Sequence, residues 1–418
     1  MAPVHQETIS LLLLPALALP STTASLISAY KRTLETLLPR LAQPKSQAIA
    51  RLDIAIVLSP SYPVSPNIPR SAVFPSVQRL LSETYSLICA VAADNKVELD
   101  FPGGLDVRIF LLESRVDQLP RGVRGKQALS GPIVDIQTFG LAARPYTTIY
   151  SVEGETGEQN LRSLITAWQS EKNRSAPPVH RLPSGPAIIQ PSSSQTSVHE
   201  DGPVTTHQSV AVGGTFDHLH IGHKLLLTAT VLAAEPSGFS SHTETPRLIT
   251  VGITGDALLV NKKYAAVVEP WSLRQQRTAE FIDSILAFHP DVPSITKTEH
   301  IDQPGPNGKV VRVTYGNDII VNYTQISDPF GPTITDEGIS ALVISRETRA
   351  GGKAVNDKRK ERGWKELEIF EVDVLDARAA MAEEEGEGQE KQESFESKIS
   401  STEIRRRLSE MRASTTGQ

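Results

Sequence analysis

Apolar and polar positions along the chain alternate in blocks that predict strands and helices in turn. In the first part, apolar runs typical of strands occupy residues 9–19, 51–60, 105–113 and 146–154, and amphipathic stretches typical of helices occupy 21–43 and 76–94. Strands that alternate with helices are typical of α/β domains. We therefore predict an α/β domain over residues 1–174, and the sequence does not indicate its role.

The apolar segment "ISLLLLPALALP" near the amino terminus has the hydrophobicity of a signal peptide. No basic region precedes it, however, and a capped amphipathic helix follows, so we predict a buried strand over residues 9–19 instead. No apolar run of the sequence approaches the roughly 20 residues that a membrane-spanning helix needs. We expect a chain that does not bind membranes.

The composition changes over residues 175–208, where Pro, Ser, Gly and Thr dominate, and this segment is predicted to be a linker. A second block of alternating elements follows. Strands are predicted at 209–213, 247–254, 310–315, 341–345 and 367–375, and helices from about 221 and over 270–288. The pattern predicts a Rossmann-like parallel-sheet domain over residues 209–410, preceded by the first α/β domain.

Two segments interrupt this second domain, and we expect both to be surface inserts. Residues 379–398 are an acidic, low-complexity insert that cannot form an apolar core. Residues 289–309 are rich in Pro, Gly and Asp. Residues 411–418 are predicted to be a carboxy-terminal tail.

Charge and cysteine content narrow the classes of protein to consider. The formal net charge of −6 argues against a protein that binds nucleic acid through bulk positive charge. The single cysteine, Cys89, excludes an intramolecular disulfide and a cysteine-rich zinc module, which fits a reducing compartment. We expect a cytoplasmic globular protein.

The stretch "VAVGGTFDHLHIGHKLLLTA", residues 210–229, holds the clearest candidate chemistry. It joins a predicted strand to a predicted helix at the carboxyl end of the strand, where open α/β sheets bind ligands. Gly213 and Gly214 permit a tight turn, and the first-turn N–H groups of the helix point at the loop. His220 and His223 can flank the positive end of that helix and donate hydrogen bonds to phosphate oxygens.

These features favour a phosphate-binding turn. Two alternatives stay open from the residues alone. Asp217, His218, His220 and His223 could bind zinc, or the turn could be purely structural. The glycine turn before a helix suits an anion better than a metal, and no HExxH motif is present.

Two sequence motifs and three further segments carry a family resemblance. The segment "GTFDHLHIGH" is similar to the HxGH signature of the nucleotidyltransferase superfamily, and "KISSTEIRRRL" resembles its ISSTxxR motif. The second motif is matched by Ile399, Ser400, Ser401, Thr402 and Arg405. The segments "NKKYAAVVEPWSLRQQR", "DPFGPTITDEGISALVISRET" and "GGKAVNDKRKERG" resemble the eukaryotic and archaeal type of phosphopantetheine adenylyltransferase. The resemblance covers about residues 209–410.

The resemblance implies transfer of the adenylyl group of ATP to 4′-phosphopantetheine, giving dephospho-coenzyme A and pyrophosphate. It implies Mg²⁺ on the triphosphate without a dedicated protein metal site, and possible partners among other enzymes of coenzyme A synthesis. The implied catalytic residues are His223, Lys262 and Arg405. The implied ATP-binding residues are Gly214, Thr215, Phe216, His220, Gly222, His223, Ser400, Ser401 and Thr402. The implied acceptor-binding residues are Thr215, Asp217, Lys262 and Arg346.

Several basic residues near these motifs have more than one interpretation. Lys263 is the alternative to Lys262 as the lysine that bridges the substrates. Arg346 and Arg349 resemble an arginine pair of bacterial members, but archaeal members depart from it here, and a solvated role fits Arg349 equally well. Arg274 and Arg277 lie one turn apart on a predicted helix, and we expect them to be structural charges at its surface.

Two further functions are alternatives to this one. The chain could be another HxGH nucleotidyltransferase, acting on nicotinamide mononucleotide or a phosphocholine-type acceptor, or an inactive homologue that serves as a scaffold. The sequence has no GxxxxGK[ST] loop, and it ends shortly after "EIRRRL". We therefore expect a monofunctional enzyme without the kinase that follows the similar region in animal coenzyme A synthase.

Overall fold

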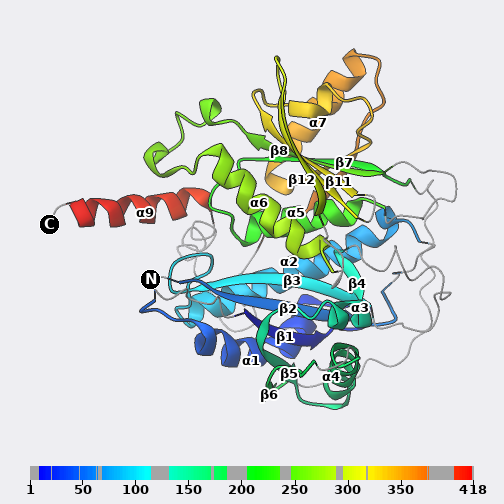
Figure 1. Cartoon of the computed structure of the whole chain (residues 1–418), viewed down its shortest axis with the longest axis vertical. Coiled ribbons are helices and arrows are strands. Elements are labelled where there is room, and N and C mark those ends of the chain that lie inside the picture. The colour runs from blue at the N-terminus through cyan, green and yellow to red at the C-terminus, as the bar shows by residue number, and fades with distance from the viewer. Residues whose placement is uncertain are drawn as a thin grey trace.

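The computed structural model describes residues 9–19, 21–46, 48–62, 64, 68–113, 131–170, 174–185, 205–235, 246–288, 295–316, 319–373, 375 and 400–416. Within these ranges the strands form a six-stranded sheet and a seven-stranded sheet. Figure 1 shows the first sheet in the lower half and the second sheet in the upper half, with helices between them. The α/β class predicted from the sequence is confirmed.

The first sheet has the strand order β4-β3-β2-β1-β5-β6, and all of its neighbouring strands are parallel. Its strands are β1 (Ile9–Pro15), β2 (Ala50–Leu58), β3 (Leu105–Glu113), β4 (Ile133–Asp135), β5 (Tyr146–Val152) and β6 (Val179–Leu182). Its helices are α1 (Thr23–Leu41), α2 (Arg70–Asp94), α3 (Ile136–Leu141) and α4 (Glu155–Trp168). The apolar segment near the amino terminus contains the predicted buried strand, but β1 ends at Pro15 and not at residue 19.

The second sheet has the order β13-β12-β7-β8-β11-β10-β9. Its strands are β7 (Ser209–Gly214), β8 (Arg247–Thr254), β9 (Ile295–Asp302), β10 (Lys309–Tyr315), β11 (Ile319–Ile326), β12 (Ala341–Ser345) and β13 (Glu368–Val372). Its helices are α5 (Ile221–Ala233), α6 (Trp271–Leu286), α7 (Arg349–Glu361) and α9 (Ser401–Thr416), with short 3₁₀ turns at 256–258, 265–267, 331–334 and 346–348.

The prediction of a parallel sheet is wrong for one side of this second sheet. Strand β10 runs antiparallel to both β11 and β9, whereas the other neighbours are parallel. All of β9 lies inside the segment 289–309 that we expected to be a surface insert. It is an edge strand with mostly exposed side chains, so its sequence lacks the apolar alternation that reveals a strand.

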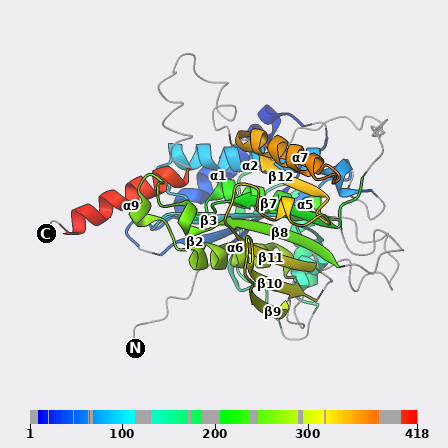
Figure 2. The same cartoon turned by 90° about the horizontal axis from the view of Figure 1, so that it is seen from above.

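Two predicted boundaries also differ from the structure. Strand β6 lies inside the predicted linker 175–208 and adds to the first sheet, while residues 186–204 lie outside the described ranges. Helix α9 continues to Thr416, into the predicted tail 411–418, and projects from one side of the molecule (Figures 1 and 2). The acidic insert 379–398 lies outside the described residues.

The two sheets are joined through α2 and α5, which contact each other directly. Helix α5 has apolar residues on nearly all sides because it lies between the second sheet and α2. A continuous apolar core includes side chains from both sheets. No helix in the described part of the chain is apolar over enough turns to cross a bilayer.

Candidate active site

The turn between β7 and α5 lies at the carboxyl edge of the second sheet, because β7 pairs in parallel with β12 and β8. Phe216 and His218 adopt left-handed φ values of 50° and 46°, which are uncommon for residues other than glycine. These two residues make the sharp turn, and not Gly213 and Gly214 as we predicted. Gly214 has a different role, since a Cβ there would lie 3.0 Å from the buried ring of Phe216.

A buried arginine of α6 holds this turn in place. Arg274 donates hydrogen bonds to the carbonyl oxygens of Thr215 at 2.6 Å, Thr254 at 2.8 Å and Glu269 at 2.8 Å. We expected a structural charge at the helix surface, but the Arg274 side chain is fully buried. Arg277, one turn further on, is about half exposed and pairs with Glu269.

The N-cap and the first turn of α5 place the two motif histidines side by side. The rings of His220 and His223 stack with their centroids 3.9 Å apart. The backbone N–H of His220 donates to Nδ1 of His223 at 3.5 Å, so a neutral His223 carries its proton on Nε2. Burial lowers the pKa of His220 well below its usual value and lowers the pKa of His223 to about 4. At neutral pH, His223 can therefore donate one hydrogen bond from Nε2 without a charge.

Gly222 is the glycine of the HxGH motif, and a larger residue there would crowd the His220 ring. A Cβ at Gly222 would lie 3.2 Å from Cε1 of the His220 ring, closer than most such contacts. The glycine therefore allows the His220 ring to lie against the first turn of α5.

A buried ion pair ties the amino end of α9 to the same turn. Nη1 of Arg405 lies 2.6 Å from Oδ2 of Asp217, and both side chains are buried. The Oγ of Ser401 donates to the carbonyl of Asp217 at 3.0 Å and lies 3.2 Å from Nε2 of His220. The structure thus brings the HxGH and ISSTxxR residues together, although they lie far apart in the sequence.

Two predicted site residues, Asp217 and Arg405, make further hydrogen bonds within the protein. Oδ1 of Asp217 accepts from the N–H of Glu269 at 2.9 Å. Arg405 donates to the carbonyl of Lys263 at 3.0 Å and to Oγ1 of Thr402 at 3.1 Å. In this structure the Asp217 carboxylate and the Arg405 guanidinium therefore support the turn and α9.

Ser400 marks the start of α9. Its Oγ accepts from the backbone N–H of Glu403 at 3.2 Å, which is the contact of a helix N-cap. Ile399, the first residue of the motif, lies outside the described residues.

Two of the predicted substrate-binding residues lie apart from the histidine pair. Lys262 and Lys263 are exposed in the loop after β8, and Arg346 is exposed in the turn after β12. Both places are at the carboxyl edge of the sheet, but no hydrogen bond or ion pair joins Lys262 or Arg346 to the histidines among the described residues. Arg349 pairs with Glu371 at the surface, in agreement with the solvated interpretation.

Sequence reasoning missed a contribution from the first half of the chain. A carboxylate oxygen of Asp100, in the loop between α2 and β3, accepts from the N–H of Ile221 at 2.9 Å. Lys224 of α5, which is buried, pairs with both Asp100 and Asp106. A signal was present in "IGHKLLLTATVLA", since a lysine within an apolar buried helix needs a carboxylate partner.

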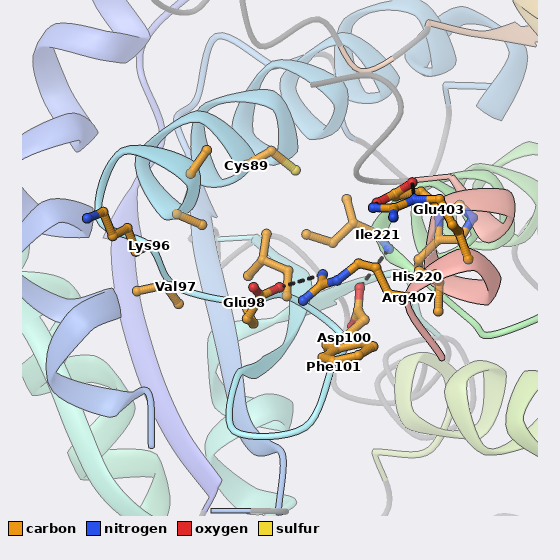
Figure 3. Close-up of a pocket in the computed structure, with 15 residues that line it drawn as sticks. Cys89, Lys96, Val97, Glu98, Asp100, Phe101, His220, Ile221, Glu403 and Arg407 are labelled. Atoms are coloured by element: carbon orange, nitrogen blue, oxygen red, sulfur yellow. Dashed lines mark hydrogen bonds and ion pairs between the residues drawn. The ribbon is translucent and has the colours of Figure 1, made fainter. Parts of the chain in front are cut away.

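A cavity of about 350 Å³ lies beside this contact, between the first half, the start of α5 and α9 (Figure 3). It is lined by Cys89, Ala92, Ala93, the segment 96–101, His220, Ile221, Glu403, Ile404, Arg406 and Arg407.

The histidines do not converge on a shared metal position. Nε2 of His218 lies 2.8 Å from the carbonyl of Val267, and Nε2 of His220 faces Ser401. The described residues include no group of three or more His, Cys, Asp and Glu side chains that could bind a metal.

Comparison with known proteins gives different results for different parts of the chain. Residues 1–188 match a family described as a domain of unknown function (DUF8446). The chain is 34% identical over 165 residues to "Uncharacterized protein C1F12.08" of Schizosaccharomyces pombe, which covers 40% of this chain and 39% of that protein. It is 35% identical over 198 residues to a phosphopantetheine adenylyltransferase of Saccharomyces cerevisiae, covering 47% of this chain and 48% of that protein.

The chain therefore matches about half or less of the length of these two fungal relatives. An archaeal relative is matched over more of its length. The chain is 30% identical over 172 residues to a phosphopantetheine adenylyltransferase of Thermococcus gammatolerans, which covers 41% of this chain and 81% of that protein.

Proposed function

Because the chain belongs to the phosphopantetheine adenylyltransferase family, we propose that it transfers the adenylyl group of ATP to 4′-phosphopantetheine. The products would be dephospho-coenzyme A and pyrophosphate. The observation that carries the proposal is the meeting of the HxGH turn and the amino end of α9 through the Asp217–Arg405 and His220–Ser401 contacts. Two helix amino ends with neighbouring hydroxyl and imidazole donors suit a chain of phosphates.

The proposed reaction needs no deprotonating residue. A phosphate oxygen of 4′-phosphopantetheine attacks the α-phosphorus of ATP, a new O–P bond forms, and the bond from the α-phosphorus to the pyrophosphate oxygen breaks. The attacking phosphate is already ionised at neutral pH. Catalysis then consists of alignment of the two phosphates and stabilisation of the charge on the transferred phosphoryl oxygens.

We assign each candidate site residue a phosphate group according to its position. His223 would donate from Nε2 to an oxygen of the α-phosphate, and Thr215 and the first N–H groups of α5 would bind beside it. The amino end of α9, with Ser401 and Thr402, would hold the β- and γ-phosphates. Lys262 would turn inward from its exposed position to neutralise charge between the substrates.

Mg²⁺ would enter with ATP. The Asp217 carboxylate at this site already accepts from Arg405 and from the N–H of Glu269, so we expect phosphate oxygens to hold the ion. When bound, Mg²⁺ neutralises phosphate charge. Association with other enzymes of coenzyme A synthesis and a cytoplasmic location stay predictions.

A panel of acceptors tests the proposal. Purified chain, ATP and Mg²⁺ are incubated with 4′-phosphopantetheine, nicotinamide mononucleotide or phosphocholine, and pyrophosphate release is measured. We expect pyrophosphate release with 4′-phosphopantetheine as the acceptor and not with the other two acceptors. Release only with another acceptor would indicate a different nucleotidyltransferase, and no release by a folded protein would support the scaffold alternative.

A further inference from the structure

The loop that joins α2 to β3 reaches across from the first half to the start of α5, and its shape is locked by backbone contacts. The N–H of Leu105 donates to the carbonyl of Glu98 at 2.9 Å, and the N–H of Asp100 donates to the carbonyl of Leu105 at 2.9 Å. A Cβ at Gly104 would lie 2.1 Å from the Glu98 carbonyl oxygen, so only glycine fits there. These contacts fix the backbone on both sides of Asp100.

Asp100 presents its carboxylate to the first turn of α5 (Figure 3). Oδ2 accepts from the N–H of Ile221 at 2.9 Å, and Oδ1 pairs with Nζ of Lys224. One carboxylate therefore holds two points of α5 that flank His223. An acid at this position also interacts favourably with the positive end of the helix.

Both side chains of the Asp100–Lys224 ion pair are buried, which restricts the pair to few arrangements. The exposed fraction of the side chain is 6% for Asp100 and 3% for Lys224. Burial alone would lower the pKa of Lys224, but the two carboxylates of Asp100 and Asp106 raise it above its usual value, so the lysine stays charged. A charged pair without water has few alternative arrangements, and α5 is therefore held in one position relative to the first half.

The same loop also contacts α9, but less firmly. Nη1 of Arg407 lies 2.8 Å from the Glu98 carboxylate, and its guanidinium lies 4.1 Å from the centre of the Phe101 ring. The side chains of this ion pair are 29% and 47% exposed, and such surface pairs contribute little to stability. The contact of Asp100 with α5 is thus the stronger link between the first half and the phosphate-binding residues.

We propose that Asp100 is a positioning residue for adenylyl transfer, so that the first half of the chain forms part of the catalytic architecture by fixing the first turn of α5. The inference rests on the proposed function. We assign Asp100 no contact with a substrate, because its carboxylate is occupied by the N–H of Ile221 and by Lys224 and acts through them. The reaction depends on alignment, and a displacement of about 1 Å can lower a rate about 100-fold.

Three variants separate positioning from stability. Asp100→Ala removes both contacts, whereas Asp100→Asn keeps an oxygen that can accept from Ile221. Thr33→Val is the control, because it removes a buried hydrogen bond from the first half, to the Pro183 carbonyl, without contact to α5. The kcat and KM for ATP are measured well below each midpoint of thermal unfolding, together with hydrogen exchange of residues 219–226.

We expect Asp100→Ala to lower kcat about 10- to 100-fold with a smaller change in KM. Exchange over 219–226 should become about tenfold faster. Asp100→Asn should recover most of the loss, and Thr33→Val should leave kcat and this exchange unchanged. The inference is overturned if Asp100→Ala and Thr33→Val have the same kcat, or if exchange over 219–226 is unchanged.

If the unaltered chain shows no adenylyl transfer, the proposed function fails by itself. The exchange measurement then decides whether Asp100 holds α5, since it needs no substrate. Unchanged exchange in Asp100→Ala would reject the inference in that case too.

Discussion

His223 is the side chain on which the account of the chemistry depends most. Its ring is placed by the His220 backbone and stacked on the His220 ring, so a preorganised donor faces the site. We predict that His223→Ala lowers kcat about 10²- to 10³-fold, as expected for loss of one preorganised donor to a transition-state oxygen. Steady-state kinetics check this, and the KM for ATP should change much less. A turnover within a few-fold of the unaltered chain would place His223 away from the reacting phosphate.

The lowered pKa of His223 also predicts a dependence of stability on pH. The folded pKa is about 4, whereas an unfolded histidine has a pKa of about 6.5. Between these values the unfolded chain binds a proton that the folded chain does not, so this residue makes stability fall as the pH decreases from about 6.5 to about 4. Urea unfolding of the unaltered chain and of His223→Gln measures the effect as a difference. Parallel pH profiles for the two proteins would contradict a folded chain in which His223 is neutral down to a pH of about 4.

At the scale of elements, α5 is the part that joins the two halves. Lys224→Met should lower the free energy of unfolding by about 3–5 kcal/mol, because it leaves the buried Asp100 carboxylate without its cation. The same substitution at Lys358, an exposed lysine of α7 paired with Glu361, should cost less than about 1 kcal/mol. Urea unfolding measures both free energies of unfolding. Equal losses would contradict a buried ion pair between Lys224 and Asp100.

The loss in Lys224→Met should shrink at low pH. Burial already raises the pKa of Asp100 to about 6, and removal of the lysine raises it further. A carboxyl whose folded pKa lies above its unfolded value stabilises the fold below that pKa and loses this effect as the pH rises. The difference between the variant and the unaltered chain should therefore be smaller at pH 5 than at pH 8. A constant difference would contradict the assignment to Asp100.

The elements near the site were predictable because their patterns are strong. Strand β7 and the start of α5 lie within a residue of the prediction, since an apolar run ends at Gly214 and the helix begins after His220. Strand β9 was not predictable, because its exposed edge position leaves it polar. Lys224 in an apolar helix indicates that a carboxylate partner exists, but the sequence does not identify Asp100 as that partner, since Ile221 lies 121 residues away and nothing local in "KVELDF" indicates the contact.

For the molecule as a whole, the sequence suggests two domains, while the larger of the two apolar clusters among the described residues includes side chains of both sheets. We therefore predict that the two halves unfold together, although chains of this length often unfold domain by domain. Trp168 of α4 and Trp271 of α6 are buried in different halves and report on each separately. Fluorescence of single-tryptophan variants should give one urea midpoint. Two separated midpoints would contradict a shared core.

Product identification by mass spectrometry decides whether this chain transfers an adenylyl group to 4′-phosphopantetheine. The purified chain is incubated with ATP, Mg²⁺ and 4′-phosphopantetheine, beside His223→Ala as control. We predict that dephospho-coenzyme A accumulates with an equal amount of pyrophosphate, that little forms with the variant, and that coenzyme A itself does not appear. A folded chain that forms no dephospho-coenzyme A at saturating substrates would contradict the account.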